Sequence, residues 1–192
     1  PRIVNCESLI AALTQPARTA DDPPVEAKLA EFLLARIRGA RDLRVTHLVR
    51  VPGGASRETW MFKATWQDGQ GRQSRQLILQ KAPPSPLLDT HRRLEFEVLE
   101  ALAESPVPVP RVLWLEVDTA ILGGAFIIME RVQDSETGPA ALLESRWDPV
   151  RPLIGRRMYE VLAGLHAFDW RTRTPAAATA GVSETSAWQA AL

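Results

Sequence analysis

The sequence is poor in cysteine, has no excess of either charge and lacks any long apolar run. Its one cysteine, Cys6, excludes a disulfide framework within the chain and a zinc site built from several cysteines. Lysine plus arginine equals aspartate plus glutamate at 23 each, so no net field attracts nucleic acid or an anionic membrane. No apolar run approaches the roughly 20 residues that span a bilayer, and the start lacks a signal-peptide layout. We therefore expect a cytoplasmic protein that binds neither nucleic acid nor membrane.

An initiator methionine is also absent, because the chain begins at Pro1. That start indicates processing or a sequence that is part of a longer protein. The composition is that of an ordinary globular protein, 45% hydrophobic and 24% charged, with enough apolar material for a substantial core. The bias towards alanine, arginine and proline suits a bacterial source, and 192 residues fit one large domain or two small ones.

Hydrophobic periodicity predicts the elements of the first two thirds of the chain. Apolar residues at helical spacing predict helices over 5–15, 25–37 and 90–103. Alternating or β-branched segments predict five strands, over 43–51, 58–66, 76–81, 111–117 and 125–132. The short turns between the first three strands favour an antiparallel arrangement. One helix therefore stands between the third and fourth strands.

The chain turns helical after Val132. A short helix is predicted over 139–144, and a longer one begins with Asp148 as N-cap and Pro149 in the first turn and ends near Phe168. A last helix is predicted over 184–192. The chain thus divides into an N-terminal helical extension (1–40), a lobe built on the sheet (41–132) and the start of a helical lobe (133–192). The longer helix carries apolar residues at core spacing, and an uncovered apolar face there would favour a homodimer.

The order of these parts has a physical meaning. A glycine-containing turn after the first strand lets the backbone approach phosphate oxygens without obstruction by side chains. A basic side chain on the third strand would neutralise phosphate charge. A carboxylate on the following helix would hold that base by a charge-assisted hydrogen bond. Together these parts predict a nucleotide-binding lobe.

Six segments carry a resemblance to a known family. They are 53–60 (GGASRETW), 77–84 (LILQKAPP), 94–99 (LEFEVL), 107–113 (VPVPRVL), 126–132 (FIIMERV) and 162–169 (LAGLHAFD). In this order they resemble the glycine loop, third strand, acidic helix, fourth-strand entry, hinge strand and first large C-lobe helix of the aminoglycoside phosphotransferase family. The branch resembled is bacterial and similar to the kinase domains linked to acyl-CoA dehydrogenases. The resemblance covers residues from about 43 to 170.

The resemblance implies an α+β, protein-kinase-like fold. Its N-lobe would hold a five-stranded antiparallel sheet with one packed helix, followed by the first helices of a helical C-lobe. The implied activity is transfer of a phosphoryl group from ATP (or GTP), with Mg²⁺, to a hydroxyl group of a small molecule. A non-catalytic nucleotide-binding module or pseudokinase is the alternative, and an α+β interaction domain without a ligand is a third interpretation.

The resemblance also implies roles for individual residues. Lys81 would be the base that contacts phosphate, and Glu95 the carboxylate that pairs with it. The other implied nucleotide-binding positions are Gly53, Gly54, Ala55 and Ser56, which would cover the phosphates, and Met129, Glu130, Arg131 and Val132, which would form the hinge that meets adenine.

The base and the carboxylate both have local competitors. Glu97 borders the apolar seam of its helix as Glu95 does, so periodicity does not separate the two. Family members commonly carry a base directly after the Leu-x-Leu of the third strand, and here that position is Gln80. Because adjacent strand residues point to opposite faces, Gln80 and Lys81 cannot both face the nucleotide without a bulge. The structural alternatives are an ordinary hairpin turn at 53–56 and a solvated lysine at the end of a strand.

The family's catalytic loop, His-Gly-Asp with a spaced asparagine, does not occur in the sequence. In this family the loop aspartate would orient the substrate hydroxyl, and the asparagine with a later aspartate would hold Mg²⁺. We therefore expect no catalytic residue and no metal ligand within 1–192, and no phosphate transfer by these residues alone. The Mg²⁺ ligands would lie outside this chain. The expected partners are the nucleotide and, for the full-length protein, a small hydroxyl-bearing substrate.

Overall fold

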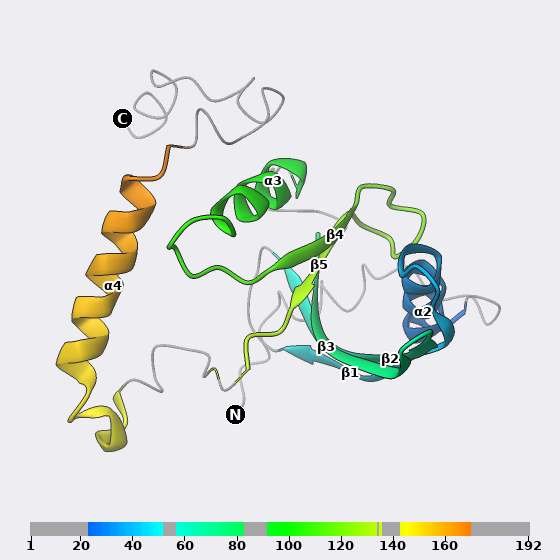
Figure 1. Cartoon of the computed structure of the whole chain (residues 1–192), viewed down its shortest axis with the longest axis horizontal. Helices are drawn as coiled ribbons and strands as arrows, with labels where there is room; N and C mark the ends of the chain where they lie inside the picture. The colour runs from blue at the N-terminus through cyan, green and yellow to red at the C-terminus, as the bar shows by residue number, and fades with distance from the viewer. Residues whose placement is uncertain (1–22, 52–56, 83–91, 134, 136–142, 170–192) are drawn as a thin grey trace, which may run out of the picture.

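The structure is a computed structural model that describes residues 23–51, 57–82, 92–133, 135 and 143–169 (Figure 1). The helices predicted over 5–15 and 184–192, most of the one predicted over 139–144, and the predicted glycine turn Gly53–Ser56 lie outside these residues. The described elements, in chain order, are α2 (Val25–Arg36), β1 (Arg41–Val51), β2 (Glu58–Asp68), β3 (Gly71–Lys81), α3 (Arg92–Leu102), β4 (Val112–Glu116), β5 (Phe126–Glu130), the 3₁₀ turn η2 (Ser145–Trp147) and α4 (Arg151–His166).

The five strands form one antiparallel sheet in the order β1-β2-β3-β5-β4. This confirms the predicted kinase-like N-lobe, in which α3 is the helix between the third and fourth strands. β3 begins at Gly71, earlier than the predicted residue 76. The added residues, 71–75, contain no apolar side chain, so they lack the hydrophobic pattern by which a strand is recognised.

The turn between β2 and β3 is closed by Asp68. One oxygen of its carboxylate accepts a hydrogen bond from the Gln70 backbone N–H at 2.8 Å, and the other accepts one from Nε1 of Trp66 at 3.1 Å. The Gln70 bond, with smaller help from Trp66 and Gln73, holds the pKa of Asp68 below its usual value because it favours the ionised carboxylate. The turn thereby fixes the register of the hairpin, which pairs Asp68 with Gly71 at one end and Glu58 with Lys81 at the other.

Helix α2 packs on one face of the sheet (Figure 1). Leu29 and Leu33 are fully buried, and the Phe32 ring meets the ring of Phe126 edge to face, with 4.9 Å between centroids. The strand residues buried in this cluster are Phe62, Ala64, Trp66, Leu77, Leu79, Phe126 and Ile128. The α2 face is therefore the larger apolar core of the described residues.

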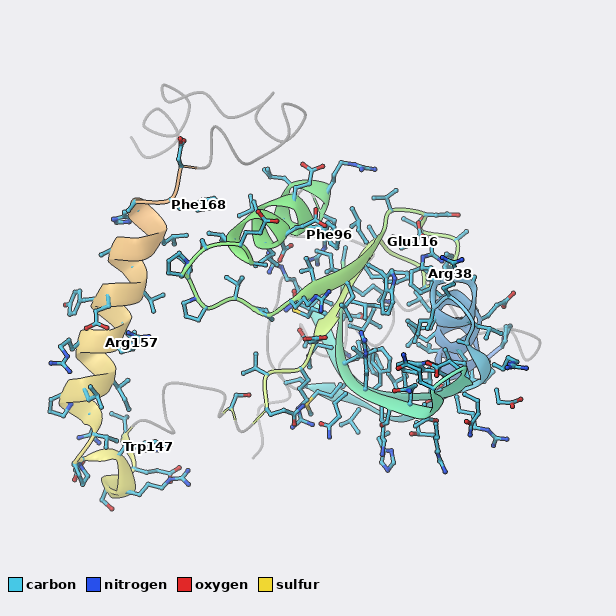
Figure 2. The ribbon with its side chains drawn as sticks, in the orientation of Figure 1. Arg38, Phe96, Glu116, Trp147, Arg157 and Phe168 are labelled. Atoms are coloured by element: carbon cyan, nitrogen blue, oxygen red, sulfur yellow. The ribbon has the colours of Figure 1, made fainter. Side chains whose placement is uncertain are left out.

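Helix α3 packs on the other face of the sheet, over β4 and β5 (Figure 1). Its Phe96 lies towards the sheet (Figure 2) and packs with Leu99 against Ile127 and Met129 of β5. Ile78 of β3 belongs to the same cluster. Alternate residues of β3 and β5 thus point to the α2 face and to the α3 face, as the period of a strand requires.

Helix α4 begins later than predicted. Val150 is its N-cap and Pro152 lies in its first turn, so the predicted cap at Asp148 with Pro149 in the first turn is wrong. The Asp148 carboxylate instead pairs with the Arg151 guanidinium at 2.7 Å, across the start of the helix.

The side chains of α4 are not buried. Its exposed large apolar residues are Leu153, Met158, Tyr159, Leu162 and Leu165. A Cβ built on Gly164 would lie 3.5 Å from the side chain of Val107, which places one point of the helix against the connector that precedes β4. Among the described residues, no helix is long and apolar enough to cross a membrane.

Candidate functional site

The end of β3 places Gln80 and Lys81 on opposite faces of the sheet. Leu79 belongs to the core under α2, whereas Ile78 belongs to the cluster under α3. Alternation along the strand therefore puts Gln80 on the α3 face with Ile78, and Lys81 on the α2 face with Leu79. No bulge interrupts this part of the strand, since the pairs with β2 run in unbroken register to Glu58↔Lys81.

Lys81 is held on the α2 face by Glu58 and by the loop before β5. Its Nζ lies 3.0 Å from Oε2 of Glu58, the residue directly opposite on β2, and donates to the Leu122 carbonyl oxygen at 3.3 Å. Its side chain is 17% exposed. In the same loop, Gly124 passes so close to β3 that a Cβ there would clash with the carbonyl oxygen of Ala82. Lys81 is therefore a strand-end base that pairs with Glu58, which also lies 3.9 Å from the exposed Arg50.

The predicted pair between Lys81 and Glu95 is wrong, because the two residues lie on opposite faces of the sheet. Glu95, in the first turn of α3, binds two arginines instead. Its Oε1 lies 2.7 Å from Nη1 of Arg57, just before β2, and its Oε2 lies 2.9 Å from Nη1 of Arg92. We call Arg57, Glu95 and Arg92 the Arg–Glu–Arg cluster.

The Arg–Glu–Arg cluster has one more positive than negative charge, and part of it is buried. The side chain of Arg92 is 4% exposed. Burial lowers the pKa of Arg92, the Glu95 carboxylate opposes this shift and the Arg57 guanidinium adds to it. Among the described residues, Nε of Arg57 and both Nε and Nη2 of Arg92 are buried without a hydrogen-bond partner. Such donors are costly to bury, so the cluster is suited to bind an anion.

A hollow of about 380 Å³ lies over β1, β2 and β3 and reaches the chain that follows β5. Its lining residues are His47, Val49, Met61, Phe62, Lys63, Gln76 and Arg131. It contains basic side chains and no acidic one. Met61 pairs across the strands with Ile78, so the hollow opens on the α3 face of the sheet, the face of the Arg–Glu–Arg cluster.

The predicted hinge residues straddle the end of β5. Met129 is buried under α3, and Glu130 is the last residue of the strand. The Arg131 backbone N–H donates to the Gln76 carbonyl oxygen at 3.2 Å, and its guanidinium donates to the Gln76 side chain at 3.0 Å. Val132 is exposed. The segment after β5 therefore borders the hollow through Arg131, while the nucleotide contact of these four residues stays a prediction.

The sequence matches the phosphotransferase enzyme family (APH) over residues 47–192. The chain belongs to this family. Among solved structures, this phosphotransferase-family chain resembles a "putative aminoglycoside phosphotransferase" from Ralstonia eutropha, with a TM-score of 0.55 and 21% identity. That match covers 76% of this chain and 39% of the other, and it shows the shared fold.

Curated relatives of the phosphotransferase-family chain are named as acyl-CoA dehydrogenases. "Probable acyl-CoA dehydrogenase IBR3" of Arabidopsis thaliana is 33% identical over 60% of this chain, and "Acyl-CoA dehydrogenase family member 10" of Mus musculus is 30% identical over 81% of it. The chain spans 14% of the length of each of these relatives.

The described residues of the phosphotransferase-family chain include donors of the kind that bind phosphate. No group of three or more His, Cys, Asp or Glu among them is placed to hold a metal. The buried guanidinium nitrogens of Arg57 and Arg92 that have no partner among the described residues are donors suited to phosphate oxygens. The sequence interpretation missed both arginines as site residues. The signals were available, because Arg57 lies inside the glycine-loop segment and Arg92 precedes Glu95 by three residues, one turn of helix.

Proposed function

We propose that the chain is the nucleotide-binding part of an ATP-dependent phosphotransferase whose acceptor is a hydroxyl group of a small molecule. The observation that carries this proposal is that the Arg–Glu–Arg cluster and the hollow lie on the same face of the sheet. A nucleotide has an aromatic base and a polyanionic tail, and these two features match those two sites. Family membership supports the phosphoryl-transfer chemistry, and the donor and acceptor are the proposed steps beyond it.

The spacing of the two sites suits an extended nucleotide. Arg57 precedes Met61 of the hollow by four residues along β2, which is about 13 Å at the rise of a strand. The base would lie in the hollow against Met61 and Val49, beside the chain after β5. The phosphate tail would then run along the α3 face towards Arg57. ATP binding in this pose needs no metal ligand from the described residues, and Mg²⁺ bound with the nucleotide would neutralise phosphate charge.

Thermal unfolding of the 192-residue chain tests the nucleotide part of the proposal. ATP at a hundred times its dissociation constant should stabilise the folded chain by about 2.7 kcal/mol, and adenosine and ADP provide the comparison. An unchanged midpoint temperature with ATP at millimolar concentration would contradict the proposal. Met61→Lys adds a charge to the floor of the hollow and should weaken both ATP and adenosine, because the base would lose its apolar contact.

The acceptor is tested on the longer protein that contains this chain. Candidate hydroxyl compounds are aminoglycosides, choline-like alcohols, sugars and hydroxyacyl thioesters. The last class follows from the acyl-CoA dehydrogenase names of the relatives. We expect labelled γ-phosphate to be transferred to one of these classes of hydroxyl compound, and only slowly to water. Tight ATP binding without transfer to any acceptor would favour a non-catalytic module instead.

A further inference from the structure

Among the described residues, the paired strands supply no basic side chain to the α3 face where β3 ends. Gln80 occupies this position, and its cross-strand neighbours are Thr59 and Ile127. None of these three side chains carries a charge. A phosphate group that approaches this end of the sheet must therefore be neutralised by a base from another element.

Arg57 lies beside this position. Because Glu58 pairs with Lys81 in an antiparallel register, Arg57 lies opposite Ala82 and diagonally across from Gln80. Diagonal neighbours of this kind are about 7–8 Å apart, within the reach of a long side chain. Arg57 also alternates with Glu58, which faces α2, and its contact with Glu95 places it on the α3 face.

The two candidate bases differ in how their donors are satisfied. Lys81 pairs with Glu58, whose other carboxylate oxygen lies 3.9 Å from the exposed Arg50, and it has a carbonyl oxygen as a second acceptor. Arg57 shares its one carboxylate with Arg92, so positive charge remains unbalanced there. Three buried guanidinium nitrogens of Arg57 and Arg92 lack a partner among the described residues. Burial strengthens the attraction of such a cluster for an anion, because less water competes for the donors.

We propose that Arg57, oriented by Glu95 and supported by Arg92, is the base that binds the phosphate groups of the nucleotide, in place of a base on the third strand. The proposal rests on the function proposed above and names the residue that binds the phosphate groups. Glu95 keeps the role of the helix carboxylate, but its partner comes from the start of β2. Lys81 and Glu58 then form a cross-strand pair that stabilises the end of the hairpin on the far face of the sheet.

Isothermal titration of the 192-residue chain with ATP and with adenosine tests the proposal. Arg57→Gln should raise the Kd of ATP about 10- to 100-fold, the loss expected for one or two hydrogen bonds to a charged group. The Kd of adenosine, which has no phosphate, should stay within about twofold. Arg57→Lys keeps the charge without the forked donors and should lose less ATP affinity than Arg57→Gln.

Arg36→Gln is the matched control. Arg36 is 33% exposed against 34% for Arg57, and it binds Glu116 at 2.6 Å on the α2 face. Its loss should change neither Kd. Adding Gln80→Lys to the Arg57→Gln variant should restore part of the ATP affinity, because a base then returns to the same face of the sheet. Circular dichroism and the midpoint temperature of each variant show that it is folded.

Three results would overturn the proposal while leaving the proposed function intact. One is unchanged ATP affinity in Arg57→Gln. Another is an equal loss of ATP and adenosine affinity in that variant, which indicates a structural role. The third is a loss of ATP affinity in Lys81→Gln that exceeds the loss in Arg57→Gln. If the unmodified chain binds neither ATP nor adenosine, the proposed function fails together with this inference.

Discussion

Replacing Phe32 by alanine tests whether α2 belongs to the core of the lobe that contains the sheet. The Phe32 side chain is almost fully buried, its ring meets that of Phe126 at 62°, and the Arg36 guanidinium lies 3.6 Å from the ring centroid. Deleting a buried phenylalanine ring costs about 3–5 kcal/mol through lost burial and the cavity that remains. The edge-to-face pair with Phe126 contributes about 0.5–1.5 kcal/mol of that loss. We expect Phe32→Ala to lower the free energy of unfolding by about 4 kcal/mol.

Urea unfolding followed by tryptophan fluorescence measures this change, since Trp60 and Trp66 lie in or against the same core. Leu34→Ala is the control, because Leu34 is on the same helix but exposed. This substitution should lower the free energy of unfolding by less than about 1 kcal/mol. Equal losses for Phe32→Ala and Leu34→Ala would refute the packing of α2 on the sheet. Combining Phe32→Leu with Phe126→Leu should reveal a coupling energy of about 0.5–1.5 kcal/mol between the rings.

Three further predictions concern the turns of the sheet and the last helix. Gly124→Ala should lower the free energy of unfolding by about 1–3 kcal/mol, because its Cβ would clash with the backbone after β3. Gly155→Ala, in open space within α4, should instead raise the free energy of unfolding by about 0.5–1 kcal/mol. Urea titrations that rank the two variants in the opposite order would contradict this prediction. The lowered pKa of Asp68 gives the fold stability that is present above the usual pKa of aspartate and is lost as pH falls through the lowered pKa. Asp68→Asn should therefore show a shallower loss of stability on acidification below that usual pKa. Identical pH profiles for the two chains would argue against this role of the Asp68 turn. The double variant Met158→Gln, Leu162→Gln should reduce any self-association seen by sedimentation, because it removes two exposed apolar side chains. Its free energy of unfolding should stay within about 0.5 kcal/mol of that of the unmodified chain. A larger loss of stability would show that this side of α4 is packed.

The sheet could be predicted from the sequence because its strands are short apolar, β-branched or alternating segments separated by clear turns. β2 is rich in aromatic residues and the second half of β3 holds the apolar run Leu77–Leu79, and both lie where they were expected. The polar half of β3 carries no such signal, and its strand form depends on pairing with β2 from Gly71 onwards. The start of α4 was misplaced for a related reason: Asp148-Pro149 is a good local start signal, but Arg151-Pro152 three residues later is another.

The candidate site was harder to predict than the fold. The strand period separates Gln80 from Lys81, but it does not say which of them faces α3, since that depends on which face α3 covers. Only the packing of Ile78 under α3 decides it. The partner of Glu95 could not be predicted from the sequence for the same reason. Arg57 and Glu95 are 38 residues apart, and they come into contact only in the folded protein. The family resemblance, not the local pattern, singled out Glu95 over Glu97, and only the tertiary structure shows that Glu95 binds Arg57 and Arg92.

The contact between α2 and β5 has a consequence for how the chain is made. Phe126 follows Phe32 by 94 residues, so α2 leaves the ribosome long before its partner is synthesised. At about 5–20 residues per second the delay is about 5 to 20 seconds. During this time the apolar side of α2, with Leu29, Phe32 and Leu33, can pack only against β1 and the early hairpin. We expect the nascent chain to expose this helix to chaperones until β5 emerges and closes the core.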